Sequence, residues 1–254
     1  MKLLEVENLS VTMNRREIVR GLSFSLCSGD WLMLIGPNGA GKSTVVNAIA
    51  GAAPYAGRIL FRGRDISGMK SAEMARHIGV LSQQHSVGYS FTVGEVVRLG
   101  RYAWNPGPFS RRSGEDERAV SEALRMTGLS DMTERNVLTL SGGELQRTFL
   151  AQLFAQEPEI LVLDEPTNHL DLPYQREIFG LIRQWLQTPG RAVISVVHDL
   201  SLARRYATKG LLLCDGAAAA AGPGESVFVS KVLERVYGMD VAAWLRELYG
   251  QWET

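Results

Sequence analysis

A glycine-rich segment near the N-terminus constrains the fold more than any other feature of this 254-residue chain. It consists of Gly36, Pro37, Asn38, Gly39, Ala40, Gly41, Lys42, Ser43 and Thr44, and it follows the apolar run 31–35. The spacing G-x-x-x-x-G-K-[ST] predicts a strand, a phosphate-binding loop (P-loop) and a helix, because the glycines let backbone N–H groups converge on a phosphate. Lys42 is then expected to reach the β- and γ-phosphates, and the Ser43 hydroxyl to bind Mg²⁺. The motif alone predicts a nucleoside triphosphate site, which kinases, GTPases and motor ATPases all share.

Further apolar runs predict an α/β chain with a parallel sheet. These runs lie at 78–82, 160–164, 192–197 and 211–214. Their nearly continuous hydrophobicity indicates strands that are covered on both faces. Apolar residues at helical spacing predict a helix over 174–187, which the Pro189-Gly190 pair stops.

Two segments depart from this pattern. Residues 84–156 are polar and rich in helix formers, with a loop broken by Gly and Pro at 105–109, which predicts a helical subdomain inserted into the α/β core. The alanine run 217–221 favours a helix by propensity, whereas the preceding Asp215-Gly216 pair is a hairpin-turn signal, so helix and strand both stay open there.

Composition excludes several classes of protein. Lys plus Arg and Asp plus Glu number 27 each, so there is no basic excess of the kind that binds nucleic acid. The segment 1–10 is too short and too acidic for a signal peptide. No apolar run approaches the roughly 20 residues that span a bilayer. A role at a membrane would therefore require another chain to hold this one there.

A pair of carboxylates stands at the end of the apolar run 160–164. Asp164 is expected to face Mg²⁺, and Glu165 to orient or deprotonate the water that attacks the γ-phosphate. Taken alone, the same residues are also compatible with an ordinary strand end whose acids are solvated.

The segment 140–146 contains a second glycine-rich helix start. Ser141 and Glu144 have the spacing of a capping box, which is the purely structural interpretation. A capping box does not require Gly142 and Gly143, however. Two glycines at a helix start leave the backbone bare, which favours the close approach of an anion such as a γ-phosphate.

Taken together, these motifs resemble the nucleotide-binding subunit of an ATP-binding cassette (ABC) transporter over essentially the whole chain, 1–254. The resemblance rests on the P-loop 36–44, the LSGGE signature 140–144, the strand end 160–166, Asn168-His-Leu-Asp171 and His198-Asp199. It implies an α/β fold with a P-loop NTPase (RecA-like) core, an N-terminal antiparallel β subdomain and an inserted α-helical subdomain at about 84–156. A short C-terminal helical tail is expected at about 229–254.

The resemblance also implies roles for individual residues. Gln83 is expected to touch Mg²⁺ and relay the state of the site to the helical subdomain, and Asp171 to link the two sites of a dimer. His198 is expected to hold the γ-phosphate and position Glu165, although a histidine at a strand end is in isolation more often purely structural. The signature residues Ser141, Gly142 and Gly143 would contact the γ-phosphate bound by the partner subunit.

One position departs from the family pattern. The family usually places an aromatic residue near position 13 to stack on adenine, whereas this chain has Met13. We expect its polarisable sulfur to take that place. We then expect this protein to discriminate less strongly among nucleotides.

The resemblance predicts an ATP-dependent homodimer that hydrolyses MgATP. The stretches 91–102, 171–175, 198–203 and 232–239 are similar to the ATPases of bacterial importers for iron–siderophore, haem or cobalamin. This predicts a subunit held by an integral membrane permease at the cytoplasmic face of the cell membrane, and linked through it to a substrate-binding protein. The aromatic residues Tyr89, Phe91, Tyr102, Trp104 and Phe109 either dock the permease or pack the subdomain's own core.

Three alternatives to an importer for iron–siderophore, haem or cobalamin remain. The chain could be the ATPase of an importer for another substrate, the ATPase of an exporter, or a soluble ABC assembly protein. DNA-maintenance ABC proteins carry long coiled-coil heptads within the cassette, which this sequence lacks. Translation-type members join two cassettes in one chain, whereas this chain has one.

Overall fold

The computed structural model describes residues 1–82, 90–104 and 113–252. The strands are β1 (Lys2–Met13), β2 (Arg16–Cys27), β3 (Trp31–Ile35), β4 (Ala56–Phe61), β5 (Arg64–Asp65), β6 (Ile78–Leu81), β7 (Ile160–Asp164), β8 (Ala192–Val196), β9 (Lys209–Cys214) and β10 (Ala217–Pro223). The α-helices are α1 (Lys42–Ile49), α2 (Ser71–His77), α3 (Val93–Leu99), α4 (Gly114–Met126), α5 (Gly142–Ala155), α6 (Leu172–Leu186), α7 (Leu200–Tyr206), α8 (Gly224–Val227), α9 (Ser230–Tyr237) and α10 (Val241–Gly250). Short 3₁₀ helices are η1 (Ile66–Gly68), η2 (Gly100–Ala103), η3 (Ser130–Met132) and η4 (Val137–Thr139).

The strands form two sheets. The central sheet has the order β10-β9-β3-β8-β7-β6, with β9, β3, β8, β7 and β6 parallel and β10 antiparallel at the edge. The second sheet is antiparallel, with the order β2-β1-β4-β5. The α/β fold expected from the apolar runs is therefore confirmed, and the run 217–221 is a strand. Asp215 and Gly216 both have positive φ (47° and 80°), so the hairpin-turn signal outweighs the weak helix propensity of alanine.

Alternate side chains of the central strands enter two different hydrophobic cores. In β3, Trp31 and Met33 belong to a core shared with α6 and the helices α3 to α5. Leu32 and Leu34 belong to a second core shared with α1 and the antiparallel sheet. Because successive side chains of a strand point to opposite faces, both faces of the central sheet are buried, which is why these strands are apolar throughout.

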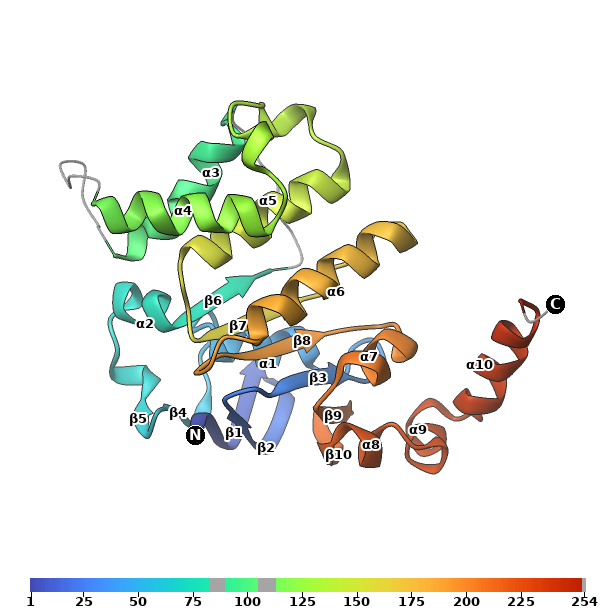
Figure 1. Ribbon diagram of the computed structural model, residues 1–254. Helices are drawn as coiled ribbons and strands as arrows, with labels where there is room; N and C mark the ends of the chain where they lie inside the picture. The colour runs from blue at the N-terminus through green and yellow to red at the C-terminus, as the bar shows by residue number, and fades with distance from the viewer. Residues whose placement is uncertain (83–89, 105–112, 253–254) are drawn as a thin grey trace.

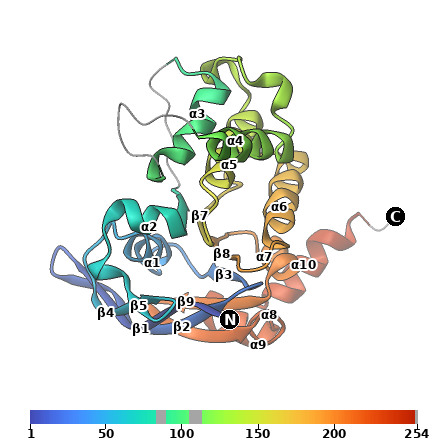
Figure 2. The ribbon, with the colours of Figure 1, turned by 60° about the vertical axis from the view of Figure 1, so that its left-hand side comes forward.

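The helices α3, α4 and α5 gather on the side of the central sheet that lies away from the antiparallel sheet (Figures 1 and 2). Residues 90–104 and 113–156 are largely helical, as the polar pattern of this segment predicts. The bounds 84–156 of an inserted subdomain stay a prediction, since part of that range lies outside the described residues. At the other end of the chain α10 lies at the periphery of the molecule (Figure 1), where the Tyr249 hydroxyl is 2.9 Å from the Ser201 hydroxyl of α7. Within the described ranges, no helix is long and apolar enough to cross a bilayer.

Candidate active site

The P-loop connects β3 to α1 and holds Lys42 at the first position of the helix. The Lys42 ammonium donates hydrogen bonds to the carbonyls of Gly36, at 2.8 Å, and Pro37, at 2.9 Å. Burial lowers the pKa of Lys42, while the carboxylates of Glu165 and Asp164 act in the opposite direction. The amine is thus fixed at the base of the loop, with two carboxylates nearby that favour its charged form.

Asp164 ends β7 and is buried beside the P-loop. Burial raises the pKa of Asp164, against a hydrogen bond from the Ser43 side chain that lowers it. The second carboxylate oxygen, Oδ1, is buried and has no hydrogen-bond partner among the described residues. A buried oxygen without a hydrogen-bond partner raises the free energy of the folded state unless a ligand supplies the missing contact. Two of the three residues that the sequence assigns to Mg²⁺, Ser43 and Asp164, are thus in contact.

Glu165 follows the strand in a left-handed conformation, with φ of 54°, and its carboxylate makes polar contacts with neighbouring side chains. Oε1 lies 2.6 Å from Nε2 of His198, and Oε2 accepts a hydrogen bond from the Asn168 side chain at 2.8 Å. A positive φ at a non-glycine residue is uncommon and is concentrated at functional sites. Because Asp164 pairs with Val196 in the parallel β7–β8 register, the ends of the two strands bring Glu165 and His198 together.

Lys42, Ser43, Glu165 and His198 share one cleft with a volume of about 1110 Å³, large enough for a nucleotide, whereas the buried Asp164 is not among its lining residues. It is lined by Arg16, Glu17, Ile18, Arg20, Asn38, Gly39, Gly41, Lys42, Ser43, Thr44, Glu165, Asn168, His198, Asp215 and Gly216. The P-loop and the predicted catalytic pair are thus joined in a single site.

The signature residues lie elsewhere. Ser141, Gly142 and Gly143 stand at the N-terminus of α5 and do not line the cleft. The capping box is present, because the Ser141 hydroxyl accepts from the Glu144 N–H and the Glu144 carboxylate accepts from the Ser141 N–H at 2.8 Å. The amides of Gly142 and Gly143 have no acceptor among the described residues. The same turn can therefore contain both the capping box and a site for an anion.

One further predicted site residue, Asp171, does not line the cleft. Asp171 is exposed, precedes α6 and makes no capping hydrogen bond with its side chain. Gln83 lies outside the described residues, so its expected contact with Mg²⁺ stays a prediction.

Several cleft residues were not assigned a role from the sequence. Asn168 was noted only as part of a motif, yet it holds Glu165. Arg16 and Arg20 reach the cleft from β2, whereas Met13, which is 50% exposed, is not among the residues that line it. Tyr237 of α9 hydrogen-bonds with the backbone of Gly36, although burial still raises the pKa of its phenol. The contacts made by Arg16, Arg20 and Tyr237 join distant segments, so no local motif identifies them.

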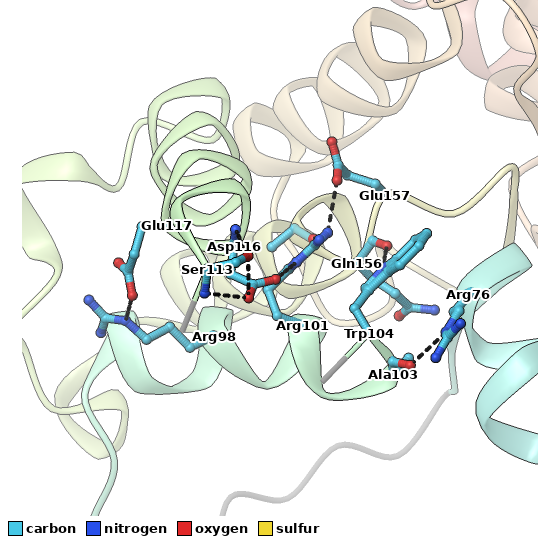
Figure 3. A network of polar contacts seen from close by, with 11 residues as sticks. Arg76, Arg98, Arg101, Ala103, Trp104, Ser113, Asp116, Glu117, Gln156 and Glu157 are labelled. Carbon is cyan, nitrogen blue, oxygen red and sulfur yellow. Dashed lines mark hydrogen bonds and ion pairs between the residues drawn. The ribbon is translucent and has the colours of Figure 1, made fainter. Parts of the chain in front are cut away.

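A polar network surrounds Trp104 at the junction of the helical cluster with the rest of the protein (Figure 3). The Trp104 ring lies 5.5 Å from the Arg76 guanidinium and 5.1 Å from that of Arg101, and its Nε1 donates to the Gln156 carbonyl at 2.8 Å. The Trp104 ring thus contacts two guanidinium groups and the end of α5, although the residue is 37% exposed. Tyr102 is more exposed, at 66%. Tyr89 and Phe109 lie outside the described residues.

A parallel sheet with a P-loop after β3, an acid pair after β7 and a histidine after β8 defines a P-loop nucleoside triphosphatase. The sequence model of the ABC transporter family matches residues 19–168. The chain belongs to the ABC transporter family and is an ATPase of that family.

Individual relatives agree with this assignment. The chain is 41% identical over 234 residues to the hemin import ATP-binding protein HmuV of Streptomyces coelicolor, covering 92% of this chain and 82% of that protein. It is 35% identical over 237 residues to the ferric enterobactin transport ATP-binding protein FepC of Escherichia coli, covering 93% and 87%. Some relatives are longer, since the chain spans 55% of YvrA, an uncharacterized ABC transporter ATP-binding protein of Bacillus subtilis, at 35% identity over 96% of this chain.

Solved structures resemble the chain over nearly its whole length. The cbiO1 protein from Clostridium perfringens, part of the ABC transporter complex cbiONQ, gives a TM-score of 0.81 at 25% identity and covers 100% of this chain and 99% of that one. The ADP conformation of MJ1267, an ATP-binding cassette of an ABC transporter, gives 0.82 at 25% identity and covers 94% and 100%.

Proposed function

We propose that this chain is the ATPase subunit of an importer for an iron–siderophore, haem or cobalamin. The proposal rests on the similarity of this chain to proteins that are named for the import of such compounds. Proteins named for hemin, ferric enterobactin and cobalamin import match at 41%, 35% and 36% identity over more than nine-tenths of this chain. The stretches that are similar to this group, such as 232–239, include Tyr237, which contacts the P-loop.

The cofactor is proposed to be Mg²⁺ bound together with ATP. Ser43 and Asp164 fit this ion, because they touch one another and leave the buried Oδ1 oxygen of Asp164 without a partner among the described residues. Mg²⁺ prefers oxygen ligands and is commonly held by one or two protein groups plus phosphates. When bound, it would neutralise charge on the β- and γ-phosphates. Gln83 is proposed as a further ligand.

In the proposed chemistry Glu165 orients and deprotonates the attacking water. His198 and Asn168 fix the carboxylate from two sides, so that its lone pairs are aimed by the protein rather than by solvent. Lys42 and the P-loop amides hold the phosphates, and the leaving phosphate stays in the field of the helix N-terminus.

We further propose that each site is completed by a second copy of the chain. Each subunit presents, away from its own cleft, a helix N-terminus whose Gly142 and Gly143 amides have no acceptor among the described residues. Such a terminus binds anions. A γ-phosphate held by one P-loop and by the partner's Ser141 turn would make ATP the bridge of a dimer, with the exposed Asp171 linking the two sites.

The partners are proposed to be an integral membrane permease and, through it, a substrate-binding protein, which places the chain at the cytoplasmic face of the cell membrane. Exposed apolar side chains on the helical cluster, such as Phe91 and Tyr102, support a docking face there. Nucleic acid is not proposed as a partner, because Lys plus Arg do not outnumber Asp plus Glu.

Affinity purification of the chain from native membranes tests this proposal. We expect a permease and a binding protein to copurify, and a Tyr102→Glu variant to lose them while its ATPase activity is unchanged. The matched control is Met239→Glu, which changes an exposed residue of the C-terminal tail. Recovery with soluble partners only would reject the importer and favour a soluble ABC assembly protein.

A further inference from the structure

The order of strands in the central sheet places two groups of cleft residues on opposite sides of the P-loop. The loop follows β3, and β8 and β7 lie on one side of that strand with His198 and Glu165 at their ends. On the other side lie β9 and β10, whose connecting turn contains Asp215 and Gly216. Since the triphosphate must end at Glu165, the rest of a bound nucleotide must extend toward the β9–β10 turn and the β2 residues beside it.

Strand β2 is held against the P-loop by backbone contacts. The Arg20 N–H donates to the Gly216 carbonyl at 2.8 Å. A Cβ at Gly41 or at Gly216 would lie only 3.0 Å or 2.3 Å from the Ile18 carbonyl oxygen, and both glycines have positive φ. This close approach fixes the residues of β2 relative to the phosphate loop.

One end of β2 supplies side chains to the cleft. Val19 is fully buried in the core below, whereas Arg16, Glu17, Ile18 and Arg20 line the cleft. The backbone of Arg20 is hydrogen-bonded to the β9–β10 turn. Arg16 is the first residue of β2 and lies farther from that turn along the strand. Of the arginines that line the cleft, Arg16 is therefore the one closest to the hairpin turn between β1 and β2.

Arg16 stands beside the position where an aromatic residue is usual in this family. Asn14 and Arg15 form the turn, with φ of 50° and 64°, and Met13 pairs directly with Arg16 across it. Side chains of directly paired residues lie on the same face of a hairpin and touch. Of the two, Arg16 lines the cleft and Met13 does not. Among residues 1–82, 90–104 and 113–252, no carboxylate forms an ion pair with Arg16, so its guanidinium is available for a ligand.

We propose that the Arg16 guanidinium is the surface on which the nucleotide base stacks, in place of an aromatic side chain. This inference rests on the proposed binding of a nucleoside triphosphate in the cleft. A guanidinium is planar and stacks on aromatic faces, whereas a thioether such as that of Met13 has no plane. Stacking uses the π face that every base has and reads no donor or acceptor at its edge. The protein therefore binds ATP and GTP with similar affinity, and pyrimidine nucleotides more weakly.

The competing role for Arg16 is an ion pair with the phosphates. The two roles separate in a comparison of MgATP with magnesium tripolyphosphate, which has the phosphates and no base. Equilibrium titration of the full chain with both ligands, and with MgGTP and MgCTP, measures the dissociation constant of each.

For the Arg16→Ala variant we expect the Kd of MgATP and of MgGTP to rise about fivefold, while that of tripolyphosphate is unchanged. Arg16→Tyr is expected to restore MgATP binding, and Arg16→Lys, which keeps the charge and loses the plane, is not. The control is Arg15→Ala, which removes a neighbouring charge outside the cleft at a position that already carries a Cβ at positive φ. Melting temperatures verify that each variant is folded.

Three results would overturn the inference. They are an equal loss of tripolyphosphate affinity in Arg16→Ala, full rescue by lysine, and a loss of MgATP affinity in Met13→Ala of the size expected for Arg16→Ala. Failure of the proposed function would look different, because the unmodified chain would then bind neither MgATP nor tripolyphosphate.

Discussion

Replacing Gly142 by alanine should leave the folded subunit intact and remove its ATP-dependent dimer. A Cβ built at Gly142 has its nearest contact at 3.8 Å, to Cδ2 of Leu170, which is ordinary van der Waals contact. Alanine is also favoured over glycine in a helix by up to about 1 kcal/mol. For a chain of this size that gain corresponds to an increase in Tm of at most about 4 °C.

The neighbouring glycine gives the opposite expectation and serves as the matched control. A Cβ at Gly143 would lie 2.3 to 2.6 Å from ring atoms of Tyr174 on α6, so the ring or the start of α5 must move. Overpacking of this kind costs about 1–3 kcal/mol, which lowers Tm by roughly 2–12 °C. Gly143→Ala therefore damages the subunit itself, whereas Gly142→Ala acts only on what approaches the exposed helix start.

Both variants are best measured in a Glu165→Gln background, where ATP is expected to persist. Thermal melts without nucleotide give the effect on the subunit, and size-exclusion chromatography with MgATP gives the effect on dimerisation. We expect Gly142→Ala to keep its Tm and elute as a monomer, because the added methyl group stands between the backbone amides and the γ-phosphate. If this variant dimerises as readily as its parent, the signature turn does not grip the phosphate of the partner subunit.

Three further outcomes follow from the geometry of the cleft. Glu165→Gln should keep MgATP affinity and lower turnover by about 10²–10⁴-fold in a steady-state ATPase assay; unchanged hydrolysis would remove Glu165 from the role of general base. Lys42→Ala should abolish MgATP binding in a titration, because it removes the ammonium at the base of the P-loop, and retained binding would contradict the assigned contact. Asp164→Asn should stabilise the subunit at pH 7 in denaturant titrations without nucleotide, because burial raises the pKa of this carboxyl in the folded chain and its ionisation therefore opposes folding. The advantage of the variant should grow as pH rises from about 3.9, the usual pKa of an unfolded Asp, to the raised folded value, and then stay constant; a constant difference across that window would show that the pKa is not raised.

The part of the site that follows from sequence is the part built from short segments. The P-loop and the Asp164–Glu165 strand end carry their chemistry within a few residues, so their spacing predicts both the local structure and the ligand. The contact of Glu165 with His198 required one more step, the adjacency of β7 and β8. Parallel strands that both end in polar residues make this adjacency a reasonable expectation, and the register places them 2.6 Å apart.

The rest of the cleft comes from contacts that no periodicity encodes. Arg16 reaches it because β2 of the antiparallel sheet packs against the turn between β9 and β10, about 200 residues farther along the chain. Tyr237 reaches Gly36 from the C-terminal tail in the same way. In sequence both look like ordinary polar positions of a strand and a helix. The run 217–221 likewise depended on its partner, since pairing with β9 outweighs the preference of alanine for a helix.

The buried Arg101 has a mechanical consequence for the helical cluster. Its guanidinium binds Asp116 of α4 at 2.8 Å, the Ala155 carbonyl at the end of α5 at 2.9 Å, and Glu157 just beyond at 2.8 Å. A Cβ at Gly100 would lie 2.1 Å from the Gln152 carbonyl oxygen, so η2 rests directly on the backbone of α5. These contacts clamp one end of a 14-residue helix, about 21 Å long, whose other end is the signature turn. A force applied near Tyr102 would therefore be carried by this helix to Gly142, and a small tilt at the clamped end would displace the signature turn at the other end.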